Sequence, residues 1–160
     1  REDTRKAACS YANNAYLYAL SVDKKPRNDT RKAACKSSEY AYYYAKYVDK
    51  KPHENTRKAA CEVLDFANYY AYYIDKKPHE DTRKAVCKDP FLAYRYAKNM
   101  DKGPNKDTRK AACKNSEWAY HYALNVDKCF TKETWLAVKG TKYEEKYKKT
   151  FNDPIKELII

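Results

Sequence analysis

Apolar and polar residues alternate along this chain in a pattern that returns every 26 residues. In residues 29–54 the apolar positions of the longer stretch are spaced i, i+3, i+4 and i+7, which places them on one face of an α-helix. These stripe positions are Ala41, Tyr44, Ala45 and Val48, and they recur as Ala15, Tyr18, Ala19, Val22, as Ala67, Tyr70, Ala71, Ile74, as Ala93, Tyr96, Ala97, Met100 and as Ala119, Tyr122, Ala123, Val126. The pattern predicts one helix per copy that buries a face of alanine and tyrosine.

A shorter helix is predicted just before each of these. The motif Asp-Thr-Arg-Lys-Ala-Ala-Cys begins at residue 29, and its copies begin at residues 3, 55, 81 and 107, with a degraded copy at 133. We expect Asp29 or Thr30 to cap a first helix that runs to about Lys36, and Ser37 to cap a second helix over residues 38–48. Asp89-Pro90 supports the second cap, since proline favours the first helical position. The prolines that end the copies are Pro26, Pro52, Pro78 and Pro104.

Consecutive copies without insertions predict an all-α fold, a right-handed α-solenoid of about six two-helix repeats with a C-terminal capping repeat. Residues 1–132 are predicted to form five tandem repeats, and residues 133–160 a divergent sixth repeat with a final helix. In the sixth copy the apolar stripe shifts to Tyr143, Tyr147 and Phe151 with charged residues on the other side, and such a polar outer face is typical of a cap. Asp153-Pro154 should begin the final helix. Its apolar residues, predicted to dock on the end of the stack or to join a second chain, are Ile155, Leu158, Ile159 and Ile160.

Composition narrows the function classes. Only two glycines are present, so glycine-rich phosphate loops are excluded, and no apolar run reaches the roughly 18 residues of a membrane span. No signal segment opens the chain, which favours a cytoplasmic location. Five of the six cysteines share one repeat position. Stacked helices lie about 8–10 Å apart, too far for disulfides between copies, so we expect free thiols; Cys129 lies outside this register.

The motif from Asp107 to Lys128, DTRKAACKNSEWAYHYALNVDK, resembles short tandem helical repeats of phage and bacterial proteins of unknown function. The similarity covers roughly residues 1–128. It implies a helical array without catalytic residues and a phage setting, in which small accessory proteins often disarm host machinery. The protein would then act in the cytoplasm of a host cell, as an inhibitor of a host defence factor.

Catalytic chemistry finds little support in the sequence. His53 and His79 are isolated in the loops between copies, and no Ser/His/Asp set, carboxylate pair or metal-ligand spacing accompanies them. We therefore predict that the protein is not an enzyme and takes no cofactor and no metal.

A ladder of basic residues is one candidate binding feature. The lysines at one repeat position, predicted as possible phosphate contacts, are Lys6, Lys32, Lys58, Lys84 and Lys110. The arginines beside them have a structural alternative, because an aspartate ends each second helix and can pair with an arginine of an adjacent copy. Residues 29–54 contain six basic and four acidic residues, so the excess of positive charge per copy is small although the whole chain carries +12.

Positions that vary between copies form the second candidate. A uniform position is explained by packing, whereas a variable outward position can encode recognition of a partner. The predicted partner-binding residues are Tyr43, Tyr47, Tyr69, Tyr72, Tyr73, Arg95 and His121. Our leading hypothesis is a module that binds a macromolecule, first of all a protein, through this face. The alternatives are binding of RNA or single-stranded DNA through the lysine ladder and tyrosines, and self-assembly through the first repeat or through Ile159 and Ile160.

Overall fold

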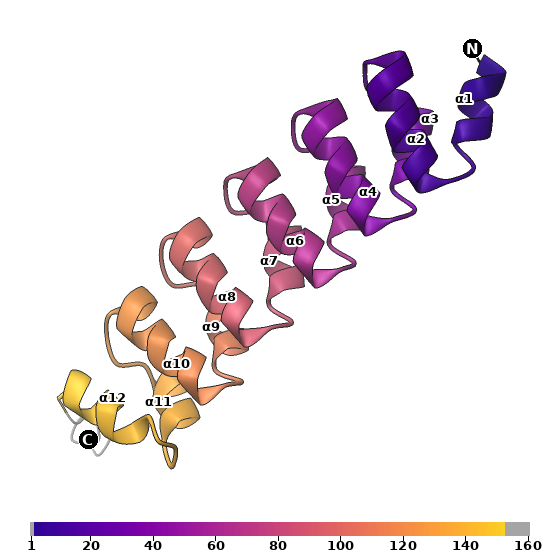
Figure 1. Ribbon diagram of the computed structural model, residues 1–160. Coiled ribbons are helices and arrows are strands. Elements are labelled where there is room, and N and C mark those ends of the chain that lie inside the picture. Colours follow the sequence, from indigo (N-terminus) through magenta and orange to yellow (C-terminus); the bar gives the residue numbers. More distant parts are fainter. Residues whose placement is uncertain (1, 153–160) are drawn as a thin grey trace. The chain divides into compact units, whose positions relative to one another are not determined.

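The computed structural model of the protein describes residues 2–152, and these residues form helices without any strand (Figure 1). The predicted all-α solenoid of two-helix repeats is thereby confirmed. The chain divides into two compact units, residues 1–85 and residues 86–160.

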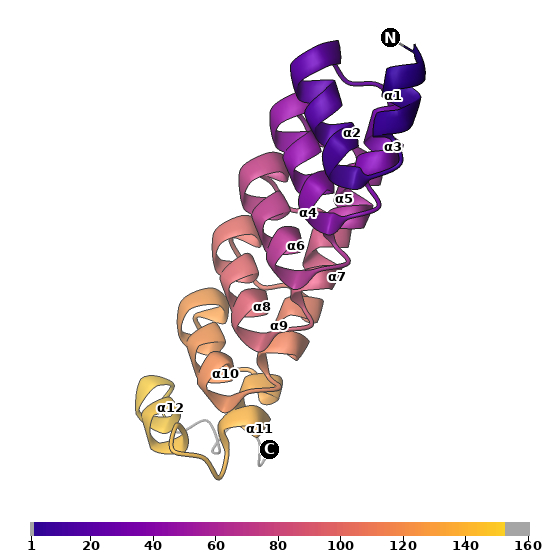
Figure 2. The same ribbon diagram turned by 45° about the vertical axis from the view of Figure 1, so that its right-hand side comes forward.

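In the first unit, each repeat joins a short first helix to a longer second helix. The elements are α1 (Glu2–Ala8), α2 (Ala12–Tyr18) with the π-helical turn η1 (Ala19–Asp23), α3 (Asn28–Ala34), α4 (Ser38–Tyr43) with η2 (Tyr44–Asp49), α5 (Glu54–Ala60), α6 (Leu64–Tyr70) with η3 (Ala71–Asp75), and α7 (Glu80–Val86), whose last residue belongs to the second unit. The second helices α2, α4 and α6 line one side of this unit, and the first helices α3 and α5 lie on the other (Figure 2).

The second unit repeats this arrangement and ends differently. Its elements are α8 (Pro90–Tyr96) with η4 (Ala97–Asp101), α9 (Lys106–Ala112), α10 (Ser116–Tyr122) with η5 (Ala123–Asp127), α11 (Lys132–Val138) and α12 (Glu144–Thr150). On α12 the shifted stripe is buried: Tyr143 and Tyr147 pack with Trp135 and Val138 against the alanines of the preceding second helix. The predicted capping repeat is confirmed, whereas Ile155, Leu158, Ile159 and Ile160 lie outside the described residues.

The alanine–tyrosine stripe forms the core, as predicted. Ala19, Ala34, Tyr44 and Val48 make one buried cluster between neighbouring repeats, because the small alanines let the helices approach until the tyrosine ring fills the remaining space. The first repeat departs from this pattern. Val22 was predicted in the core but is 49% exposed, since among the described residues no second helix packs on the outer face of α2.

The second helices extend further than the sequence predicts and change their winding. Residue 48 was the expected end in the second copy, but the helix continues to Asp49 through a π-helical turn. The hydrogen bonds of a π-helix span five residues, and the third copy provides an example in the bond from the Lys76 amide to the Ala71 carbonyl (2.9 Å). Such a turn ends in every one of the five copies with a lysine in the left-handed conformation.

The start of the first helix differs from the prediction. Asp29 and Thr30 already lie inside α3, and the N-cap position is Arg27, equivalent to His53, Asn105 and Thr131. These four residues have extended backbone, and only such a residue can leave the helical path while its side chain faces the free amides. Ser37 occupies the N-cap of α4 without a capping bond from its side chain.

The proline-marked start of α8 agrees with its prediction. Asp89 is the N-cap, its carboxylate accepts a hydrogen bond from the Leu92 amide (2.8 Å), and Pro90 is the first helical residue.

Candidate binding surface

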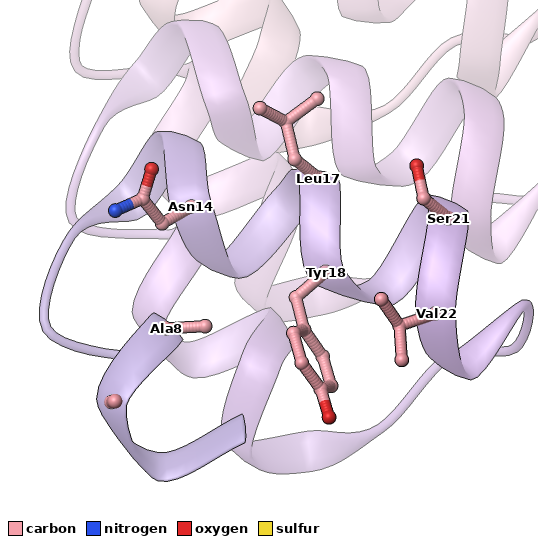
Figure 3. A pocket seen from close by; sticks show the side chains of 7 residues that line it. Ala8, Asn14, Leu17, Tyr18, Ser21 and Val22 are labelled. Carbon is pink, nitrogen blue, oxygen red and sulfur yellow. The ribbon is translucent and has the colours of Figure 1, made fainter. Parts of the chain in front are cut away.

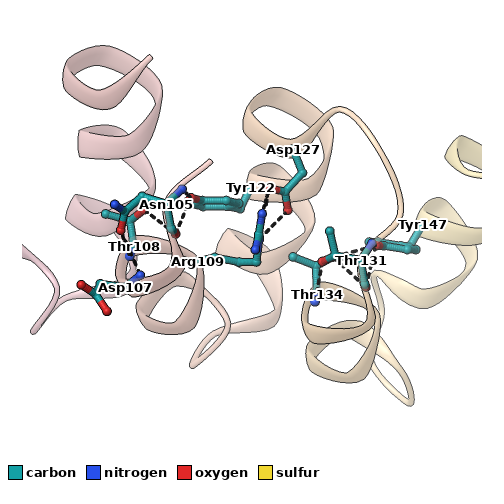
Figure 4. A network of polar contacts seen from close by, with 9 residues as sticks. All are labelled: Asn105, Asp107, Thr108, Arg109, Tyr122, Asp127, Thr131, Thr134 and Tyr147. Carbon is teal, nitrogen blue, oxygen red and sulfur yellow. Dashed lines mark hydrogen bonds and ion pairs between the residues drawn. The ribbon is translucent and has the colours of Figure 1, made fainter. Parts of the chain in front are cut away.

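The buried tyrosine hydroxyls join the two helices of a repeat (Figure 4). The Tyr122 hydroxyl lies 2.9 Å from the Thr108 hydroxyl and accepts a hydrogen bond from the Asn105 amide (3.0 Å). Equivalent hydroxyl pairs are Tyr44 with Thr30, Tyr70 with Thr56 and Tyr147 with Thr134, at 2.7–2.9 Å. Burial raises the pKa of the Tyr122 hydroxyl. These tyrosines hold the fold and are not available to a partner.

The arginines of the basic ladder are also committed to structure. Arg109 donates from Nε to both carboxylate oxygens of Asp127 (3.1 and 3.0 Å) and from Nη2 to one of them (2.7 Å; Figure 4). The same pairs form between Arg31 and Asp49 and between Arg57 and Asp75. The prediction that arginines pair with adjacent copies is wrong for these three, because each pair closes within its own repeat. Arg5 does reach the next copy, at Asp29 (2.7 Å).

The predicted ladder of first-helix lysines is exposed but partly neutralised. All five, Lys6, Lys32, Lys58, Lys84 and Lys110, are solvent-accessible. Lys58 and Lys84 pair with glutamates one turn earlier in their own helices, Glu54 and Glu80, at 2.5 Å each. Two members of the ladder therefore already hold a counter-charge.

The outward tyrosines of the first unit fall into two groups. Tyr47, Tyr69 and Tyr73 are exposed by 44%, 42% and 57%. Tyr43 and Tyr72 are half-buried. The Tyr43 ring lies 5.4–6.2 Å from four other tyrosine rings, three on its own helix and one, Tyr16, on α2. The accessible aromatic surface is therefore carried by Tyr47, Tyr69 and Tyr73.

A lysine lies among these rings. The Lys46 ammonium lies 5.1–5.4 Å from the ring centres of Tyr42, Tyr47 and Tyr73 and donates to the Tyr42 hydroxyl (3.1 Å). That hydrogen bond raises the pKa of Lys46. The cation is held by aromatic faces rather than by a carboxylate.

The two remaining predicted residues, Arg95 and His121, belong to the second unit and are half-buried. The Arg95 guanidinium lies over the Phe91 ring at 5.4 Å. His121 contacts Trp118 and Tyr120, with ring centres 5.7 and 5.4 Å away. Both side chains pack against aromatic neighbours, which leaves them less accessible than the exposed tyrosines of the first unit.

A second set of lysines escaped the sequence prediction. Lys24, Lys50, Lys76, Lys102 and Lys128 each follow the aspartate that ends a second helix, with φ between 52° and 57°. A residue with a Cβ atom pays about 1 kcal/mol or more in this conformation, where glycine is favoured. The signal available in the sequence is the Asp-Lys dipeptide that ends the second helix in all five copies.

Two equivalent hollows of about 360 Å³ each lie beside these lysines in the first unit. The hollow between the first and second repeats, here the upper hollow, is lined by Ala19, Leu20, Lys24, Tyr47, Val48 and Lys50. The hollow between the second and third repeats, here the lower hollow, is lined by Ala45, Lys46, Lys50, Lys51, Pro52, Tyr73, Ile74 and Lys76. The two lie 26 residues apart in register, and each combines one exposed tyrosine with two left-handed lysines.

A third hollow, of about 570 Å³, opens on the outer face of the first repeat (Figure 3). It is mainly apolar, and its lining includes Leu17, Tyr18 and Val22. In the next repeat the equivalent residues, Tyr43, Tyr44 and Val48, are half-buried or buried against α2 and η1. The first repeat thus exposes a surface whose equivalent in the second repeat is covered by the preceding repeat.

The loop histidines have a structural role. His53 Nδ1 accepts from the Asn55 amide and His79 Nδ1 from the Asp81 amide, at 3.2 Å each, so both cap first helices. Within residues 2–152 no group of three or more His, Cys, Asp or Glu side chains is placed to hold a metal ion. The same part of the chain contains no helix long and apolar enough to cross a membrane.

Comparison with known proteins finds no match among family models, curated proteins or solved structures. The resemblance to phage and bacterial repeats, and the role as an inhibitor of a host defence factor, remain predictions from the sequence.

Proposed function

We propose that the protein is a non-enzymatic binding module that holds a macromolecular partner on the outward face of its second helices. The observation that carries this proposal is the exposure of Tyr47, Tyr69 and Tyr73 on successive second helices of one unit, above a stripe whose two alanines and tyrosine recur in the first five copies. Exposed neighbouring aromatics are typical of contact surfaces, and tyrosine is enriched among the residues that dominate binding energy.

Affinity capture tests this proposal. The immobilised protein is incubated with a lysate of its native host, and retained proteins and nucleic acids are identified with and without nuclease treatment. The triple variant Tyr47→Ala/Tyr69→Ala/Tyr73→Ala should lose the specific partner, because all three rings are exposed and their removal leaves the core intact.

Tyr11→Ala is the matched control, since Tyr11 is 67% exposed but lies outside the second-helix face. This variant should retain the partner. Equal capture by the wild-type protein and by the triple variant, with both folded by circular dichroism, contradicts the proposal.

A further inference from the structure

The two lysine-bordered hollows of the first unit are built alike. In the upper hollow Tyr47 lies with Lys24 and Lys50, and in the lower hollow Tyr73 lies with Lys50 and Lys76, so Lys50 borders both. An exposed ring and a pair of ammonium groups therefore recur with each repeat along the same edge.

The positive charge of this edge is not balanced by the protein. Neither hollow has an aspartate or glutamate in its lining, and in the described part of the chain no carboxylate forms an ion pair with Lys24, Lys50 or Lys76. Each lysine follows an aspartate in the sequence, and arginines hold these carboxylates: Asp49 and Asp75 are 1% exposed beside Arg31 and Arg57. Asp23, 9% exposed, pairs with Arg27 at 3.2 Å. The structural use of the arginines thus leaves the neighbouring lysines without internal counter-ions.

The apolar part of the edge suits flat rings. Tyr47 and Tyr73 expose about half of their surface, and their hollows have aliphatic walls formed by Val48 and Ile74. Nucleobases stack on exposed aromatic side chains, and lysines beside the stack contact the phosphates. Helical-repeat proteins that bind RNA use this kind of step, one base for each repeat.

We propose that the edge formed by the two hollows binds single-stranded nucleic acid, with a base against Tyr47 and another against Tyr73, and with phosphates between Lys24, Lys50 and Lys76. This inference depends on the proposed function, for it names the partner class of the same tyrosine face. It replaces the sequence-based preference for a protein partner, because an acidic protein would satisfy the lysines but supplies no flat ring at each repeat. A duplex keeps the faces of its bases stacked inside, so it offers phosphates but no free face to stack on a tyrosine.

Fluorescence anisotropy with labelled oligouridylate and oligothymidylate of about 20 nucleotides tests the inference, with a duplex of equal length and polyglutamate as comparison probes. At least one single strand should bind, with affinity falling roughly tenfold or more between about 50 and 200 mM salt. The duplex and polyglutamate should bind at least about tenfold more weakly than that strand.

Two triple variants each remove three positive charges, but from different parts of the first unit. Lys24→Gly/Lys50→Gly/Lys76→Gly changes the edge and suits the left-handed backbone, whereas Lys6→Gln/Lys32→Gln/Lys58→Gln changes the first helices. The first triple should weaken single-strand binding by about tenfold or more, and the second by less than about threefold. Tyr47→Leu/Tyr73→Leu, which preserves every charge, should also weaken binding by about tenfold or more.

Several outcomes overturn the inference: no binding of either strand at low salt, equal binding of the duplex or polyglutamate, or equal losses from the two lysine triples. Lys24→Asn/Lys50→Asn/Lys76→Asn repeats the test if the glycine variant does not fold, because asparagine also tolerates the left-handed conformation.

Failure of this inference is distinguishable from failure of the proposed function. If the strands do not bind but a nuclease-resistant partner is still captured and lost with the tyrosine triple, the face binds a protein and only the partner class is wrong. If capture is also unaffected by the tyrosine triple, the proposed function fails as well.

Discussion

At the scale of single residues, the repeat assigns each side chain to one task. The sequence indicates that the stripe tyrosines are buried, because they share a helix face with alanines, and the structure confirms this for Tyr44, Tyr70, Tyr96 and Tyr122. It does not indicate the partner of their hydroxyls. Thr30 and its equivalents look like N-caps in the sequence, and only the pairing of the two helices shows that they face the tyrosines instead.

Removing one such hydroxyl should be costly. Tyr70→Phe leaves the buried Thr56 hydroxyl and the His53 amide without their tyrosine partner, so the free energy of unfolding should fall by about 1–2 kcal/mol. Urea denaturation measures this change. Tyr73→Phe is the control, because Tyr73 is an exposed residue. This variant should leave the denaturation midpoint unchanged. Equal losses of stability from the two variants contradict the expectation.

Thiol reactivity should separate the cysteines. Burial raises the pKa of Cys35 and Cys113 to about 11, so at pH 8 only about one thiol in a thousand is ionised at these sites. Cys129 is exposed and should react first with a chromogenic disulfide reagent. Cys129→Ser should remove the fast phase, and a fast phase that persists in this variant contradicts the assignment.

The same two thiols make stability depend on pH in one direction. Their folded-state pKa values exceed the ordinary value of 9.0, so the folded state favours the neutral thiol. Their contribution to stability is complete below about pH 9 and is lost as the pH rises towards about 11.

At the scale of helices, the sequence predicts which elements form better than where they begin and end. Alanine–tyrosine spacing and proline breaks suffice to count two helices per copy, and the structure has them. The π-helical turns are not predictable from the stripe. The spacing of Tyr44, Val48 and Asp49 places them on neighbouring faces of an α-helix and of a π-helix alike. The aspartate–arginine pair within one repeat and the left-handed lysine are recognised only once the π-helical turn is known.

The loop histidines provide a test at this scale. His53→Ala removes the acceptor for the Asn55 amide and should lower the free energy of unfolding by about 1 kcal/mol. His53→Asn should preserve stability, because Asn105 performs the same capping in its own repeat with bonds to two amides. Chemical denaturation compares the two variants, and equal destabilisation by both indicates that the imidazole has another role.

At the scale of the whole molecule, composition does not indicate which positive charges are paired. All basic positions look equivalent in a sequence that carries +12, and the first-helix lysines seemed the natural phosphate ladder. The contacts separate them: buried aspartates neutralise Arg57 and Arg109, and glutamates neutralise Lys58 and Lys84. Within residues 2–152 neither kind of carboxylate pairs with the left-handed lysines. Which charges remain depends on pairings across two helices, and these follow from the fold rather than from composition.

Self-association is also tested on the whole protein. The outer face of the first repeat exposes Leu17 by 51% and Val22 by 49%, so it should draw copies together as concentration rises. Sedimentation velocity should show a mass increase that Leu17→Glu abolishes. Leu136→Glu changes an exposed leucine of the second unit and should have no effect; one sharp monomer boundary at every concentration argues against self-assembly.

The threonine–tyrosine and arginine–aspartate bonds close inside single repeats, and this has a consequence for how such a chain can change in length. A 26-residue segment cut out or duplicated in frame takes its own polar partners along, and what it leaves at the junction is mostly a fit between alanines and rings. Recombination, natural or in the laboratory, could therefore treat the segment as an exchangeable cassette. The number of repeats would then change by whole units, and each new junction would reuse the existing contact between neighbouring repeats.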